Sequence, residues 1–177
     1  LRAIDPRARL MMAEPLLAIH HAHWTGRPLW EAHGWHDAQF QAFELLGGWM
    51  WPQVGGDPSF VDIVGVNYYW NNQWNHGGLT VDVDDVIYRP LSDLLFEVSA
   101  RYGRPMLISE TGTEGDRRGA WFDYVAAETA RARTRGVPVE GGGSGGRPTE
   151  LLAEGLGLVG RELDDQAATA LEGDAHD

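Results

Sequence analysis

The sequence lacks cysteine and lysine entirely, and it has no long apolar run. The absence of cysteine excludes a disulfide framework, a thiol nucleophile and a cysteine zinc site. No stretch approaches the about 20 consecutive apolar residues that cross a bilayer as a helix. The formal net charge is −12, so long-range repulsion disfavours a phosphate backbone or an anionic membrane as partner. We therefore expect no binding to nucleic acid and no binding to a membrane.

The sequence also contains no clear motif for a metal site, a nucleotide-binding loop or a serine nucleophile. Five histidines (His20, His21, His23, His33 and His36) are close in sequence, but they do not form the HExxH pattern and no second ligand cluster accompanies them. There is no GxxxxGK[ST] phosphate loop, and the run "GGGSGG" at 141–146 has linker composition with no strand before it. We expect no cofactor and no metal.

Short apolar segments alternate with helical stretches along residues 1–141. The segments at 8–15, 61–70, 104–111 and 136–141 are bounded by Pro, Gly or Asp, as strands buried on both faces are. Helices are expected over 36–49, 90–102 and 119–135. This order predicts parallel strands joined by right-handed crossovers. Its size fits an α/β fold that is a partial (β/α)8 TIM barrel, about the last four β/α units.

The composition changes after residue 141. Residues 147–177 carry eight acidic residues and two arginines, so they hold half of the net charge. Glycine-rich linkers are flexible, and acidic segments poor in aromatic residues seldom pack. We expect residues 142–177 to be a linker and a flexible acidic C-terminal tail, either partly helical or foreign to the native chain.

Polar residues follow the expected strands at the end where parallel β/α folds bind ligands. A carboxylate there serves as nucleophile or acid/base, and neighbouring amides and phenols hold it ionised. That combination suits glycosyl transfer, and flat indole rings suit sugar faces. Alternatively, the carboxylates are structural residues that form salt bridges at the rim of the barrel, and the aromatic residues serve only in packing. The candidates are Glu14, His20, Asn67, Tyr68, Tyr69, Trp70, Trp74 and Glu110.

Two segments resemble the retaining β-glycosidases of glycoside hydrolase clan A, in particular family 1-like enzymes. They are "DIVGVNYYWNNQW" at 62–74 and "RPMLISETG" at 104–112. The resemblance implies that Glu110 is the nucleophile, that Tyr68 or Tyr69 donates a hydrogen bond to it, and that Asn67 lines the same mouth. It covers residues 1–141 and implies the C-terminal half of a TIM-barrel glycosidase domain.

The same resemblance implies an acid/base in an Asn-Glu-Pro motif on barrel strand four. "AEP" at 13–15 is similar, but only one strand separates Glu14 from Glu110 where two are required. The acid/base is therefore expected upstream of Leu1. The sequence also departs from the family at Thr111, where Asn is usual, and after "GVPVEG", where glycines replace an eighth strand with its Trp.

These features predict a β-glucosidase-like hydrolase of O-glycosidic bonds with a carbohydrate substrate, incomplete as it stands. Two alternatives stay open. One is a non-catalytic carbohydrate-binding or assembly module, and the other is a smaller barrel or a dimer in which Glu14 and Glu110 form a self-sufficient acid pair. A half barrel exposes strand edges and apolar surface, so we also expect self-association.

Overall fold

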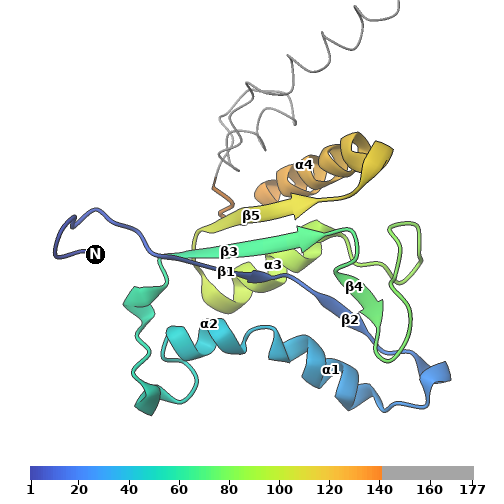
Figure 1. Cartoon of the computed structure of the whole chain (residues 1–177), viewed down its shortest axis with the longest axis horizontal. Helices are drawn as coiled ribbons and strands as arrows, with labels where there is room; N and C mark the ends of the chain where they lie inside the picture. The colour runs from blue at the N-terminus through green and yellow to red at the C-terminus, as the bar shows by residue number, and fades with distance from the viewer. Residues whose placement is uncertain (141–177) are drawn as a thin grey trace, which may run out of the picture.

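The computed structural model describes residues 1–140, and the expected linker and acidic tail at 142–177 lie outside them. Figure 1 shows strands in the middle of the molecule with helices along them. Strands and helices occur in the order β1 (Met11–Pro15), β2 (Ala18–His20), α1 (Leu29–Ala38), α2 (Gln41–Leu46), β3 (Ile63–Tyr69), β4 (Gln73–Asn75), α3 (Leu91–Tyr102), β5 (Met106–Gly112) and α4 (Arg118–Thr134). Within residues 1–140, every helix is too short or too polar to span a lipid bilayer.

The main sheet is parallel, and its strands lie in chain order. β3 occupies the centre, with β1 on one edge and β5 on the other. Beyond β5, Met106 forms a parallel bridge with Val139, and its backbone N–H donates to the carbonyl of Pro138 at 2.9 Å. The prediction of an α/β fold with parallel strands is confirmed. The strands of the described residues form an open sheet and do not close a barrel.

The strands predicted at 8–15, 61–70 and 104–111 are confirmed: β1 and β3 lie within the predicted bounds, and β5 begins two residues later and ends one residue later than predicted. Of the segment predicted at 136–141, the described residues 136–140 contribute the bridge at Val139, and Pro138, which has no backbone N–H, interrupts the ladder there. The sequence prediction missed a second sheet, in which β2 and β4 pair in parallel. His20 therefore lies at the end of a second strand, β2, and does not directly follow the strand predicted at 8–15.

The helix predicted over 36–49 is in fact two helices that meet at Gln39 and Phe40. The Gln39 side chain binds backbone outside the helix: its Oε1 accepts from the N–H of Leu17 at 2.8 Å, and its Nε2 donates to the Leu17 carbonyl at 3.2 Å. Phe40 is buried against this break. The helices expected over 90–102 and 119–135 are confirmed as α3 and α4, and α3 ends before Gly103, whose φ of 58° suits glycine.

The core lies on one face of the main sheet. Val64, Val66 and Tyr68 alternate along β3 and are buried together with Met106 and Ile108 of β5. Burying a Val, Leu or Phe side chain stabilises a fold by about 1.5–3 kcal/mol. The helices cover this face with apolar side chains. They are Phe43 of α2, Leu91, Leu94, Leu95 and Val98 of α3, and Trp121, Val125 and Ala126 of α4.

The opposite face of the sheet is less covered. Ile63 and Leu107, which lie between the core positions of their strands, are only partly buried, and Met11 is 45% exposed. The outer edge of β1 has no paired strand within the described residues. An apolar face beside a free strand edge favours association with another chain.

We expect the 177-residue chain to self-associate through this face. Leu107→Glu should weaken association by about 10- to 100-fold, because a buried carboxylate without a partner costs about 1–3 kcal/mol. Val86→Glu, at a loop residue that is 99% exposed, is the matched control. Sedimentation velocity over a concentration series measures the change, and a monomer at all concentrations would contradict it.

Candidate active site

The pairing of β3 with β5 contains one irregularity, and it determines where Glu110 points. Val66 pairs with Ile108, but the next residue, Asn67, pairs with Glu110, so Ser109 is an extra residue. Such a bulge changes the side-chain alternation of the strand. Ser109 Oγ donates to Asn67 Oδ1 at 2.6 Å. Glu110 thus lies beside Asn67 on the face away from the helices.

The residue after Glu110 returns to the helix side. Thr111 Oγ1 accepts a hydrogen bond at 2.9 Å from the indole N–H of Trp121, a residue of α4. Trp121 in turn stacks on Tyr68, with ring centroids 5.7 Å apart. The bulge therefore separates an exposed carboxylate from a buried aromatic cluster within one strand.

Tyr69 is the phenol that contacts Glu110. Its hydroxyl donates to Glu110 Oε2 at 2.8 Å, and this bond to the carboxylate raises the pKa of Tyr69 above its ordinary value. Tyr68 is not the donor, because it is fully buried and its hydroxyl bonds to the hydroxyl of Tyr88 at 2.7 Å. Burial raises the pKa of Tyr68 as well. Of the two tyrosines left open by the sequence, the geometry selects Tyr69.

Glu14 lies on the other side of the sheet. It pairs in register with Val66, a core residue, so its side chain faces the helices. There it lines a cavity of about 450 Å³ together with Gln39 and Ala42. The structure does not bring Glu14 to the face of Glu110, and the geometry gives no support to an acid pair formed by these two residues.

The two candidate tryptophans contact residues other than Glu110. Trp70 faces α4, where the Arg117 guanidinium lies 5.0 Å from the centre of its ring. Trp74 is on β4 and pairs with Ile19 of β2. Trp70 is 38% exposed, so its ring is partly open to solvent.

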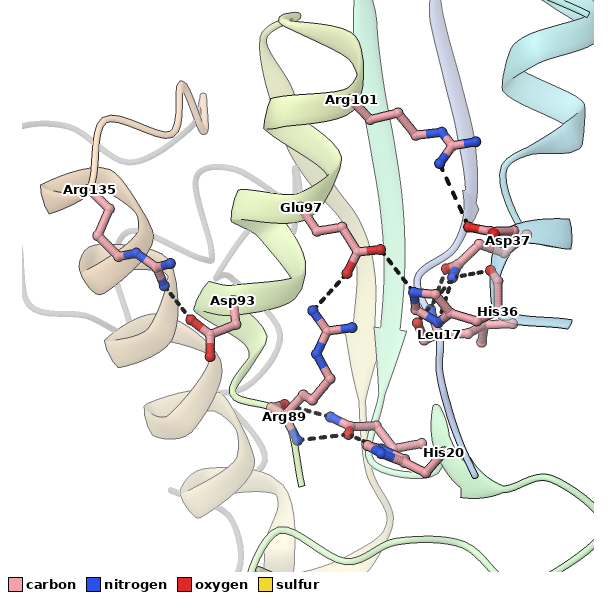
Figure 2. A network of polar contacts seen from close by, with 11 residues as sticks. Leu17, His20, His36, Asp37, Arg89, Asp93, Glu97, Arg101 and Arg135 are labelled. Carbon is pink, nitrogen blue, oxygen red and sulfur yellow. Dashed lines mark hydrogen bonds and ion pairs between the residues drawn. The ribbon is translucent and has the colours of Figure 1, made fainter. Parts of the chain in front are cut away.

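His20 belongs to a polar network that joins the two sheets to the helices (Figure 2). Its Nε2 lies 3.0 Å from Gln73 Oε1, which also accepts from the N–H of Arg89 at 3.0 Å. Gln73 Nε2 donates to the hydroxyl of Tyr68 at 2.9 Å. Burial lowers the pKa of His20 below its ordinary value. This histidine is thus held by structural contacts, which sequence reasoning did not reveal.

Glu97 connects the same network to α1. One carboxylate oxygen lies 2.8 Å from His36 Nε2 and the other accepts from Arg89 at 2.6 Å, as Figure 2 shows. The hydrogen bond from His36 and the bond from Arg89 lower the pKa of Glu97 to about 2. The network fixes α1, α3 and the segment before α3 relative to one another.

Histidine and carboxylate side chains do not gather into a metal centre in the part of the chain that is described. Residues 1–140 contain no group of three or more His, Asp or Glu side chains placed to hold an ion. His20 and His36 are both engaged in the network above.

Comparisons with known proteins gave the following findings. No family model matches the sequence, and no curated protein matches it. Among solved structures, the chain is similar to the monomer structure of a hyperthermophilic β-glucosidase mutant that forms a dodecameric structure in the crystal form. The identity is 16% and the TM-score is 0.49, and the match covers 74% of this chain and 32% of that chain. This chain therefore spans about a third of the length of that β-glucosidase.

We expect Tyr69 to ionise at lower pH in Glu110→Ala than in the unaltered chain. The hydrogen bond to the carboxylate favours the protonated phenol, so its removal should return the Tyr69 pKa toward about 10. A pH titration of the tyrosine ring carbons by ¹³C NMR measures the change. Glu114→Ala, at an exposed glutamate on the loop after β5, is the control. An unchanged Tyr69 titration in Glu110→Ala would show that the bond is absent in solution.

Glu97→Gln should lower the free energy of unfolding by about 1–3 kcal/mol at neutral pH, because His36 and Arg89 lose a charged partner. The folded pKa is depressed, so the stabilisation is complete above the unfolded pKa of about 4.5 and declines as pH falls toward about 2. Thermal unfolding of both proteins at pH 7 and pH 3 tests this. The gap in Tm should shrink at pH 3, and a gap that grows there would contradict the assignment. Glu114→Gln serves as the control.

Proposed function

We propose that residues 1–141 are the C-terminal half of a TIM-barrel retaining β-glycosidase, and that Glu110 is its nucleophile. In this proposal, the Glu110 carboxylate attacks the anomeric carbon of a β-glucoside-like substrate. The bond to the leaving-group oxygen breaks with its electron pair, and a glycosyl-enzyme ester forms. Water then hydrolyses the ester and releases the sugar.

The observation that carries the proposal is the bond from Tyr69 to Glu110 at the carboxyl end of the parallel sheet. The Tyr69 hydroxyl donates to Glu110 Oε2 at 2.8 Å, and this bond holds the carboxylate in a fixed position on the open face of the sheet. Asn67, on the same face, is held by Ser109 and has its amide nitrogen left to bind a sugar hydroxyl. Ligand sites of parallel β/α folds lie at this end of the strands.

The strand order also supports a barrel half. β1, β3, β5 and the bridge at Val139 follow one another across the sheet in chain order. Right-handed crossovers then place every connecting helix on the same face, as in a barrel wall. A doubly wound sheet would instead reverse its order and be covered on both faces.

The proposed reaction needs a second carboxyl group about 5–5.5 Å from Glu110. Glu14 cannot supply it from the helix side of the sheet, so the proposal places the acid/base on barrel strands that precede Leu1. The chain would then hold the nucleophile and part of the sugar site.

Covalent trapping tests the proposal. A 2-deoxy-2-fluoro-β-glucoside with a dinitrophenolate leaving group needs no acid catalyst for the first step, and its fluorine slows hydrolysis of the ester. In a protein that joins this chain to the barrel strands preceding it, we expect one sugar per chain, located on Glu110 by peptide mass spectrometry. Glu110→Gln should abolish the label, and Glu114→Gln should keep it.

Undiminished labelling in Glu110→Gln would overturn the proposed nucleophile. A different result would favour a non-catalytic carbohydrate-binding or assembly module: the protein binds saccharide, binding persists in Glu110→Ala, and no covalent label forms. Circular dichroism spectra of the variants that match the parent exclude unfolding as the cause.

A further inference from the structure

A second cavity lies on the helix side of the sheet, away from the face of Glu110. It has a volume of about 190 Å³ and lies between the end of β3, the loop after β5 and the first turns of α4. Its walls include the rings of Trp70, Trp121 and Tyr124. An apolar cavity of about 150 Å³ is enough to hold a benzene ring. The volume and the walls therefore fit one aromatic ring with a small substituent.

Two of the aromatic side chains that line the cavity, Trp121 and Tyr124, are held in place by contacts within the fold. The Trp121 and Tyr124 ring centroids lie 5.4 Å apart, and the Trp121 N–H is held by Thr111. The Tyr124 hydroxyl accepts from the backbone N–H of Leu91 at 3.1 Å. A preorganised apolar site loses little conformational entropy when a ligand binds.

The charges at this cavity balance. Arg117 and Asp82 both line it, one cationic and one anionic, and the Arg117 guanidinium lies over the Trp70 ring. A charged ligand would gain from one of these groups and be repelled by the other. An uncharged ligand with one polar group is the better fit, because the guanidinium donates hydrogen bonds and the carboxylate accepts them.

Thr113 supplies a polar group that has no partner in the fold. It lines the cavity, and its Oγ1 is shielded from solvent without a hydrogen-bond partner among residues 1–140. A buried hydroxyl left unpaired costs free energy, and most buried polar groups in proteins are paired. A rotation of about 120° about χ1 moves the hydroxyl to another staggered position, and in the proposed complex the hydroxyl takes the staggered position that faces the ligand.

We propose that this cavity binds a small uncharged phenol. The aromatic ring lies among Trp70, Trp121 and Tyr124, and the ligand hydroxyl bonds to the polar groups of Thr113, Arg117 and Asp82. The site is separate from the proposed Glu110 chemistry and does not depend on it.

The test uses the 177-residue chain and 4-fluorophenol, followed by ¹⁹F NMR. We expect saturable broadening and a saturable shift of the fluorine signal at millimolar concentration or below. Ala120→Phe places a ring in the cavity and should weaken binding tenfold or more. Ala130→Phe, at an exposed alanine further along α4, is the matched control and should leave binding unchanged.

A second variant tests the hydroxyl without adding volume. Thr113→Val should weaken binding of 4-fluorophenol by about tenfold, the effect of one hydrogen bond, while binding of fluorobenzene stays unchanged. Thr134→Val, at an exposed threonine of α4, is its control. The absence of saturable binding by the unaltered chain would overturn the proposal. So would unchanged 4-fluorophenol binding in Ala120→Phe or in Thr113→Val.

Discussion

The position of Glu110 depends on one extra residue in the ladder between β3 and β5. Without Ser109 as a bulge, strict alternation after Ile108 would send Glu110 to the helix side, into a core of aromatic rings. An ionised carboxylate there would lose much of its hydration, which costs free energy. The bulge turns Glu110 to the open face and returns Thr111 to Trp121, so the core and the candidate site both rely on it.

The two neighbouring tyrosines of β3 lie on opposite faces of the sheet and have different surroundings. Tyr68 and Tyr69 carry the same phenol, and the pKa of each is raised, but for different physical reasons. For Tyr68 the cause is burial among Tyr88, Tyr124 and Trp121, and for Tyr69 it is the neighbouring carboxylate of Glu110. One tyrosine is therefore part of the core, and the other contacts an exposed carboxylate.

The sequence predicted the elements that depend on local pattern and missed those that depend on pairing. Apolar runs bounded by Gly and Pro identify β1, β3 and β5, and periodicity identifies α3 and α4. The break at Gln39 and the short β2–β4 sheet rest on contacts between residues far apart in the chain. The same limit applies to the candidate site. Glu110 and Tyr69 could be proposed from the sequence. The face of the sheet on which Glu14 lies depends on the pairing of Glu14 with Val66, which no local sequence pattern predicts.

Glu110 is exposed, and this exposure bears on the role proposed for its carboxylate. A carboxylate in contact with water is strongly hydrated, and charges act on one another weakly at high dielectric. Catalysis by a carboxylate gains from a site that excludes water and fixes the dipoles around it. A wall packed on the open face would cover Ile63, Leu107 and Met11, satisfy the edge of β1 and remove water from Glu110. Under the proposed function, one further wall would cover both the apolar surface and the exposed carboxylate, and the second carboxyl group of the proposed reaction would come from that wall.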